Sequence, residues 1–226
     1  MPAKPQDARL ISSVTEQTRR TGYAVGEARR RRILEVAMEQ FAEWGYHASS
    51  MPRIAKAVGI TTTGLTHHFR TKEELLVEVL RERDREDMAY VENFDLHGII
   101  TLQAQVELAR VNAERPVLIR LFTVLAGEAG NPDHPAHHYF RQRYESGIGI
   151  LATGLRESIE QGMVRPEVDP ERVARESMAM MDGLQIQWGI NPERVDLVEA
   201  TRSYMDDLCR QITVDGSGLP DRPARE

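Results

Sequence analysis

The residues best suited to specific chemistry lie between positions 45 and 76, where hydroxyl and basic side chains surround two short apolar segments. Threonine hydroxyls can bond phosphates or base acceptors, their methyl groups can contact thymine, and a lysine ammonium can bind phosphate. The pattern favours contacts to nucleic acid. The residues that we expect to make them are Ser50, Thr61, Thr62, Thr63, Thr66 and Lys72.

A short helix, a glycine turn and a second short helix must position these side chains. A serine at position 49 or 50 can cap the first helix, whose apolar residues recur at helical spacing. Gly59 ends it, because a tight turn favours a residue that is comfortable at positive φ. Thr61 can cap the second helix, Thr62–His68, which is stable only if Leu65 packs on the helix before it. Such a pair, with a polar outward face, fits the DNA major groove.

The run IAKAVGITTTGLTHHFRTKEELL resembles the DNA-binding domain of the TetR family of bacterial transcriptional regulators, and RRRRILEVAMEQFAEWGYHASS extends the similarity upstream. The resemblance covers about residues 27–87. It implies a helix-turn-helix at about residues 50–69, with His67 and His68 contacting phosphate or base edges. Many members carry an aromatic residue where this chain has Thr66, so the resemblance does not predict the base sequence that it reads.

The charge of the chain is divided unevenly. Residues 1–76 hold 12 basic and 8 acidic residues, a net charge of +4, whereas the remainder holds 17 and 27, a net charge of −10. A basic module on an acidic body can face a phosphate backbone while the body is repelled from it. Four arginines in a row are unfavourable near the positive end of a helix dipole, so we interpret them as phosphate contacts rather than as a solvated helix start. They are Arg29, Arg30, Arg31 and Arg32.

Three histidines, His134, His137 and His138, raise the alternative of a metal or catalytic site. Pro135 places the start of the helix after His134, so the spacing of four residues does not ensure a shared helical face. No cysteine is nearby, and Asp133 is better placed as a cap. We therefore expect no metal, no cofactor and no enzymatic activity, with packing or exposure as the role of these histidines.

The rest of the chain is expected to be helical, which makes the fold all-α with an N-terminal three-helix DNA-binding module and a C-terminal helical bundle. The first helix, about Glu27–Trp44, carries Ile33, Ala37, Phe41 and Trp44 on one apolar stripe. Thr71 and Glu74 form a capping box for a helix that links the two domains. Later helices are expected at about residues 98–113, 116–130, 135–162, 170–189 and 192–214. We expect a disordered extension at 1–26, a DNA-binding domain at 27–87, an effector-binding and dimerisation domain at 88–214, and a disordered tail at 215–226.

The resemblance also implies that the last two helices pair with a second subunit and that the C-terminal domain encloses a cavity. The apolar residues that we expect in the dimer interface are Met178, Leu184, Trp188, Val198 and Met205, although packing within their own domain explains part of each stripe. The residues that we expect to line an effector pocket, rather than only the core, are Tyr90, Phe94, Phe122, Tyr139, Phe140, Tyr144 and Met181.

The sequence therefore predicts a ligand-responsive repressor that binds an inverted-repeat DNA operator as a homodimer. Its other partner would be a small apolar or aromatic effector. The lone Cys209 and the lack of a long apolar run favour a cytoplasmic protein without a membrane partner. The alternative from another class is a helical ligand-binding or scaffold protein whose DNA module no longer binds, and a metal-dependent enzyme built on the histidines is a third.

Overall fold

The computed structural model describes the backbone of residues 5–91 and 97–220, and the side chains of residues 26–90 and 97–220. Within these ranges the chain is helical, with one isolated bridge between Val164 and Thr213 and no longer strand. The predicted all-α fold is confirmed. The helices are α1 (Pro5–Ala48), α2 (Met51–Val58), α3 (Thr62–His68), α4 (Lys72–Val91), α5 (Ile100–Ala113), α6 (Pro116–Glu128), α7 (His137–Glu160), α8 (Pro170–Ile190) and α9 (Leu197–Ile212).

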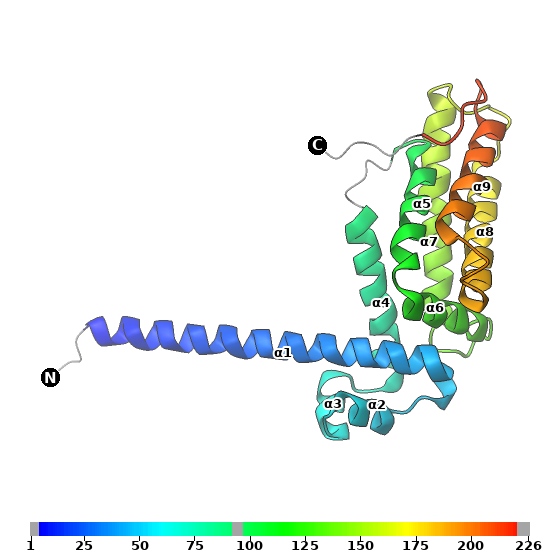
Figure 1. Ribbon diagram of the computed structural model, residues 1–226. Coiled ribbons are helices and arrows are strands. Elements are labelled where there is room, and N and C mark those ends of the chain that lie inside the picture. The colour runs from blue at the N-terminus through cyan, green and yellow to red at the C-terminus, as the bar shows by residue number, and fades with distance from the viewer. Residues whose placement is uncertain (1–4, 92–96, 221–226) are drawn as a thin grey trace.

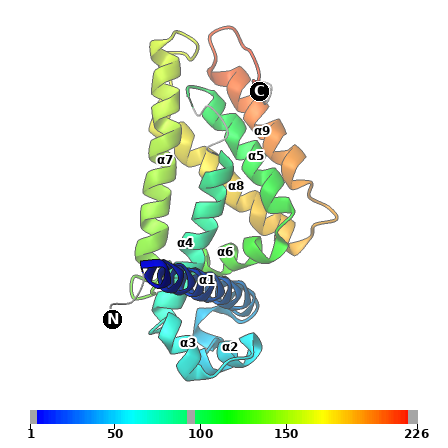
Figure 2. The same ribbon diagram turned by 90° about the vertical axis from the view of Figure 1, so that its left-hand side faces the viewer.

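The helices are arranged as an upright bundle above a small basal group, which consists of α1, α2 and α3. α5, α7, α8 and α9 form the bundle, α1 runs across its lower end, and α2 and α3 lie on the far side of α1 (Figure 1). Figure 2 views α1 end-on and shows α4 rising from the basal group beside the bundle. α6 packs against both α1 and α8, so it joins the bundle to the basal group.

Two apolar cores hold this arrangement. The first contains Phe41 of α1, Leu65 of α3 and Leu75 of α4 together with Leu121 and Leu125 of α6. All five side chains are fully buried. The second is built from α5, α7, α8 and α9. Because α4 continues to Val91 and the first core includes α6, a domain boundary at residue 87 stays a prediction.

α1 is longer than the sequence predicted. It begins at Pro5 rather than near Glu27, so the expectation of disorder over residues 1–26 differs from the structure for residues 5–26, while residues 1–4 lie outside the described chain. No proline follows Pro5 in this stretch, and extending a helix that is already nucleated costs little. The predicted apolar stripe is buried at Ile33, Ala37 and Phe41.

α1 is kinked at Gly45. Its φ of 70° lies in the left-handed region, and a Cβ atom there would come 2.4 Å from Oε1 of Glu128. Glycine is therefore favoured because the backbone is left-handed here, and the absence of a Cβ leaves room for the carboxylate of Glu128.

The C-terminal elements also differ from the prediction. α9 begins at Leu197 instead of near Pro192, because Asp196 caps it by accepting hydrogen bonds from the backbone of Val198 and Glu199. Residues 215–220, expected to be disordered, fold back on α9: the N–H of Leu219 donates to Asp206 at 2.9 Å. Residues 221–226 lie outside the described chain.

Candidate DNA-binding surface and effector cavity

The helix-turn-helix forms as the sequence predicted. α2 ends at Gly59, whose φ is 80°, and Oγ1 of Thr61 caps α3 by accepting the N–H of Gly64 at 3.0 Å. Leu65 and Ile54 are fully buried in the first core, and α2 and α3 contact each other. Capping and packing therefore fix the short α3 at a defined angle to α2, although isolated helices of this length are unstable.

The outward face of α3 is polar and open. Thr62, Thr63 and His67 are exposed, and Thr66 and His68 are half-buried. The Thr66 hydroxyl donates to the backbone oxygen of Thr63 at 3.1 Å. Ser50 is also exposed, at the start of α2, and within the described chain its side chain makes no capping hydrogen bond. These hydroxyls are placed where a groove of DNA could reach them.

The imidazole of His68 lies at the edge of this face. Burial lowers the pKa of His68, and the charges of His67, Arg29 and Arg30 lower it further. The neutral ring is therefore favoured, which provides one donor and one acceptor for hydrogen bonds instead of a second cation.

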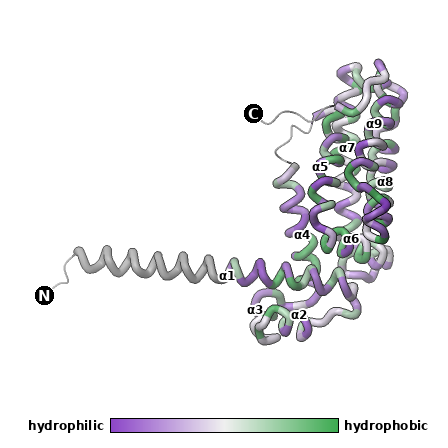
Figure 3. Tube along the Cα trace, in the orientation of Figure 1, coloured by the Kyte–Doolittle hydropathy of each residue, from purple (hydrophilic) through white to green (hydrophobic). Residues whose placement is uncertain are grey.

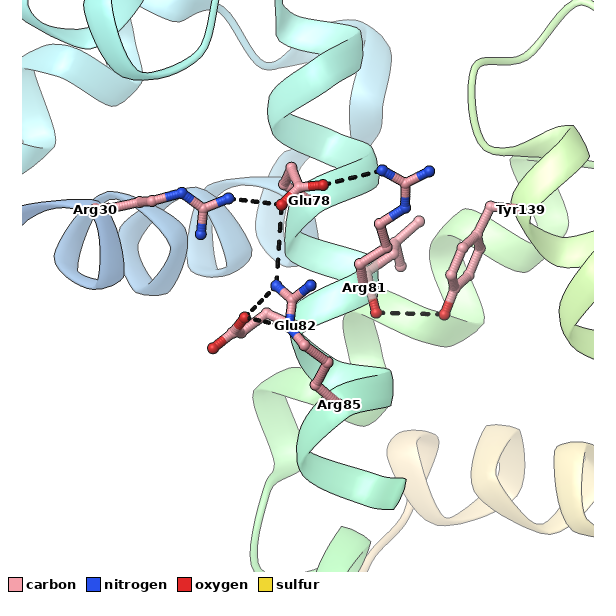
Figure 4. A network of polar contacts seen from close by, with 7 residues as sticks. Arg30, Glu78, Arg81, Glu82, Arg85 and Tyr139 are labelled. Carbon is pink, nitrogen blue, oxygen red and sulfur yellow. Dashed lines mark hydrogen bonds and ion pairs between the residues drawn. The ribbon is translucent and has the colours of Figure 1, made fainter. Parts of the chain in front are cut away.

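The four consecutive arginines at positions 29–32 of α1 do not share one role. Arg30 pairs with Glu78 of α4 at 2.6 Å and lies 5.1 Å above the ring of Phe69, directly after α3. Figure 4 shows Glu78 between Arg30, Arg81 and Arg85. Arg32 pairs with Glu35 within α1. Arg29 and Arg31 are exposed and make no ion pair with the described residues, which leaves these two guanidinium groups open to phosphate.

Lys72 is placed differently from the expected phosphate contact. Its ammonium donates to the backbone oxygens of Tyr46 at 2.8 Å and Ser49 at 2.9 Å. It also lies 4.0 Å above the ring of Tyr46, whose hydroxyl donates to Glu73 at 2.5 Å. Lys72 therefore fastens the end of α1 to the start of α4, because most of its hydrogen-bonding capacity is used inside the protein.

Three exposed cations on the basal group were not among the predicted contacts: Arg53 and Lys56 of α2, and Arg70 after α3. The guanidinium of Arg53 stacks 4.1 Å above Trp44, which is 43% exposed rather than part of the buried stripe of α1. Their basic character within a helix-turn-helix was visible in the sequence, and only their exposure required the fold.

A cavity of about 450 Å³ lies among α4, α5, α6, α7 and α8. This volume is in the range of sites for small molecules. Phe122, Tyr139, Tyr144 and Met181, all predicted as pocket residues, line it. Phe140 does not: it packs against Phe122, with ring centroids 4.9 Å apart, in the first core.

Two predicted pocket residues remain, Tyr90 and Phe94. Tyr90 also lies off the cavity wall, since its hydroxyl donates to Glu107 at 3.2 Å. Phe94 falls outside the described residues. Met178, predicted for the dimer interface, is instead part of the cavity wall.

Charged side chains form a connected group on the same wall. Asp84 of α4 accepts hydrogen bonds from Arg143 and, at 2.6 Å, from the hydroxyl of Tyr139. Tyr144 donates to Asp182 of α8 at 2.7 Å. Burial raises the pKa of Tyr139 and of Tyr144 above the ordinary range, so both hydroxyls remain protonated donors. The polar groups of α4, α7 and α8 thus meet at one cavity.

The histidine cluster has a packing role. Nδ1 of His134 accepts the N–H of Ala136 at 3.2 Å, and its Nε2 lies 3.3 Å from Glu128. His137 contacts the backbone oxygen of Ala129, and His138 is exposed. In the described chain, no three His, Cys, Asp or Glu side chains gather as metal ligands would.

The five residues that were expected in the dimer interface differ in their burial. Met205 is fully buried in the second core, so it cannot contact another subunit, and this prediction is wrong. Leu184 and Trp188 pack partly against the small cluster around Met181 and Leu197, and Val198 packs against the second core. The exposed apolar residues of α8 are instead Ile186 and Ile190, at 48% and 79%. Helical spacing alone could not separate these two faces.

The family model for bacterial regulatory proteins of the tetR family matches residues 33–79, and the model for the C-terminal part of BetI-type transcriptional repressors matches residues 100–212. This chain belongs to the TetR family. It is a DNA-binding transcriptional regulator, and residues 33–79 contain the helix-turn-helix described above.

Individual relatives agree with the TetR assignment. The fatty acid metabolism regulator protein of Bacillus subtilis (strain 168) is 23% identical over 190 residues, which cover 80% of this chain and 93% of the relative. A TetR regulator from Chloroflexus aurantiacus J-10-FL is 25% identical, with a TM-score of 0.73 over 84% of this chain and 98% of that one. The structure of FadR from Bacillus subtilis in complex with stearoyl-CoA is 21% identical, with a TM-score of 0.69 over 79% of this chain and 97% of that one, and this likeness shows the fold alone.

Among the described helices, none has both the length and the apolar character that crossing a membrane requires. Figure 3 illustrates the mixture of hydrophilic and hydrophobic residues along them.

Proposed function

We propose that this TetR-family regulator is a repressor that binds an inverted-repeat operator as a homodimer and responds to a small molecule in the cavity. The placement of α4 carries the proposal. Lys72, at its start, fastens the helix-turn-helix, whereas Asp84 and Asp87, three to four turns later, line the cavity. A single helix therefore connects the two sites.

In this proposal the exposed side chains of α3 read bases and the free cations around it bind phosphate. Thr62, Thr63 and His67 are open to a groove, while Arg29 and Lys56 flank the same module. Base contacts determine sequence preference, whereas phosphate contacts add affinity that weakens with salt. This division predicts different effects for the two groups of residues.

A second copy would place two α3 helices on one face of the duplex. The exposed apolar face of α8, with Ile186 and Ile190 four residues apart, supports α8 as part of the dimer interface. Both side chains would leave water in a dimer with two-fold symmetry. We expect half-buried Trp188, on the same helix, to contribute as well.

The effector would act through its different affinity for the DNA-binding and the released arrangement of the dimer. That the related Bacillus subtilis FadR holds stearoyl-CoA in its structure supports a ligand-binding role for this fold. The relatives are regulators, so we further propose that this chain is not an enzyme and that it works in the cytoplasm, where its DNA lies.

The test begins with genome-wide mapping of bound DNA, followed by fluorescence anisotropy with the mapped operator and with a random duplex. We expect tight operator binding, weaker binding to random DNA, and a steep decrease of both with salt. Thr63→Ala should change which operator variants are preferred. Lack of binding to any duplex at low salt would support the alternative, a helical ligand-binding or scaffold protein.

A further inference from the structure

Arg83 is a buried cation whose hydrogen-bonding groups are incompletely used. It lies on α4, lines the cavity, and is only 3% exposed. Its Nε is 3.5 Å from Asp87, and among the described residues Nε and Nη1 have no hydrogen-bond acceptor. A guanidinium carries five N–H donors, and buried donors without acceptors are costly and rare. Arg83 therefore forms a loose ion pair with Asp87, but its Nε and Nη1 donors lack acceptors among the described residues.

A second guanidinium stands next to it. Arg83 and Arg143 both lie over the ring of Phe122, with Cζ atoms 4.3 and 5.0 Å from its centroid. Arg143 has a partner, because it donates to Asp84. Arg83 is buried and Arg143 is half-buried, and an anion between two guanidinium groups that converge on one ring would relieve their repulsion.

The nearby carboxylates satisfy this need only in part, because Asp87 lies 3.5 Å from Arg83 without accepting a hydrogen bond from its Nε. Both oxygens of Asp84 are already bonded, one by Arg143 and the other by Tyr139. Asp87 also faces Arg115, which lies 3.8 Å from its Oδ1. Asp182 already accepts the Tyr144 hydroxyl, and burial raises the pKa of Asp182 although Tyr144, Arg143 and Arg83 act to lower it. Gln105 of α5, which also lines the cavity, adds another donor nitrogen without an acceptor in the described chain.

The rest of the wall is suited to an apolar group. Phe122, Met178 and Met181 line the cavity together with Ile150 and Leu151. Methionine side chains adapt to varied shapes, and an apolar body would leave water on entering. The cavity thus combines an apolar wall with buried donors.

We propose that the effector is an amphipathic monocarboxylate, with its carboxylate bound by Arg83 and its apolar body against Phe122, Met178 and Met181. A planar guanidinium can hold both carboxylate oxygens at once, which gives direction as well as affinity. The inference rests on the proposed function, because it names the chemical class that the effector cavity accepts.

Three matched probes test the charge of the ligand: 4-phenylbutanoate, 4-phenylbutan-1-ol and 4-phenylbutyltrimethylammonium share an apolar body and differ in their head group. Isothermal titration calorimetry with the full chain measures each Kd. We expect 4-phenylbutanoate to bind on the order of 10–100-fold more tightly than the alcohol, the range expected for a charge-assisted pair. Equal or tighter binding of the alcohol or of the ammonium probe would overturn the proposal, as would no saturable binding of 4-phenylbutanoate.

Arg83→Met tests the residue itself. It should remove the preference for 4-phenylbutanoate over the alcohol, whereas the control Arg120→Met, an exposed arginine on α6, should keep it. Because Arg83→Met leaves the buried carboxylate of Asp87 with only Arg115 nearby, its melting temperature should fall, and removal of the second charge should restore it. Arg83→Met with Asp87→Asn neutralises both partners. If neither form folds, Arg83 is a structural cation and the proposal fails.

Operator binding separates this inference from the function on which it rests. DNA binding together with no preference for 4-phenylbutanoate would refute only the ligand class. Binding of 4-phenylbutanoate through Arg83, with operator affinity unchanged at saturation, would support the ligand class and contradict the proposed ligand response.

Discussion

Replacing Lys72 by methionine tests whether its ammonium stabilises the fold or binds a DNA phosphate. The change keeps the aliphatic chain and removes the ammonium that donates to Tyr46 and Ser49 at 2.8 and 2.9 Å. A hydrogen bond from a charged donor contributes about 1.5–3 kcal/mol, and the stacking on Tyr46 adds about 0.5–1 kcal/mol at a partly exposed site. Water can replace part of both, so we expect a loss of about 3 kcal/mol of unfolding free energy.

Differential scanning calorimetry measures this loss. In a chain of this size each kcal/mol lowers Tm by about 2–4 °C, which predicts a decrease of about 6–12 °C for Lys72→Met. The salt dependence of binding to random DNA should keep its slope when measured well below the new Tm, since the ammonium is used inside the protein.

Lys56→Met is the matched control, because Lys56 is exposed on the neighbouring α2. It should leave Tm unchanged and make the slope of log K against log salt shallower by about one unit. If Lys72→Met instead kept its Tm and lost one unit of slope, Lys72 would be the phosphate contact that its sequence position suggested. The reasoning from the two backbone oxygens would then be refuted.

Three further predictions concern assembly, pH and the link between α1 and α4. Ile190→Glu should yield monomers by light scattering and lower operator affinity, because the dimer would bury an unpaired carboxylate. Burial lowers the pKa of His134, so the unfolded chain binds a proton on this imidazole more readily than the folded chain does. The free energy of unfolding should therefore fall as pH decreases through 6.5 towards the lower pKa of the folded state. In thermal melts, His134→Asn should flatten this pH dependence. Glu78→Gln removes the ion pair with Arg30 and should weaken operator binding in anisotropy while leaving the Kd for 4-phenylbutanoate unchanged.

Each of these has an outcome that contradicts it. Val214→Glu, at an exposed site beyond α9, should remain a dimer, and a dimeric Ile190→Glu would exclude that part of α8 from the interface. If His134→Asn left the pH dependence of Tm unchanged, groups other than His134 would cause the loss of stability at low pH. Full operator affinity in Glu78→Gln would show that Arg30 needs no partner to support α3.

Local signals predicted the helix-turn-helix well. Thr61, Gly59 and the bounds of Thr62–His68 follow from capping and turn preferences, which act over a few residues. The same reasoning identified Thr71 as a cap, and its hydroxyl accepts the N–H of Glu74 at 3.1 Å. The carboxylate of Glu74, however, accepts the N–H of Arg70 rather than that of Thr71.

Long-range contacts determine what the sequence could not. The oxygens that hold Lys72 lie 26 and 23 residues earlier in the chain, and no spacing rule connects them. Met205 and Ile190 are both apolar residues of the last two helices, but only the packing of α9 on α5 decides which one is buried. Aromatic content indicated a pocket, whereas its most distinctive group, Arg83, was hidden among the many charges of α4.

The charges of α4 also explain how one helix can serve both sites. Glu78 pairs with Arg30 beside Phe69, at the end of α3, and Arg83 lies only five residues later on the cavity wall. Burial alone would raise the pKa of Glu78, but hydrogen bonds from Arg81 and Arg30 lower it. The ionised carboxylate is therefore favoured, and it pairs with Arg30 of α1. A ligand that binds Arg83 therefore acts on the same turns of α4 that carry Glu78. Because the two sites share one rigid element within about 8 Å of helix, the coupling between them needs no longer chain of contacts.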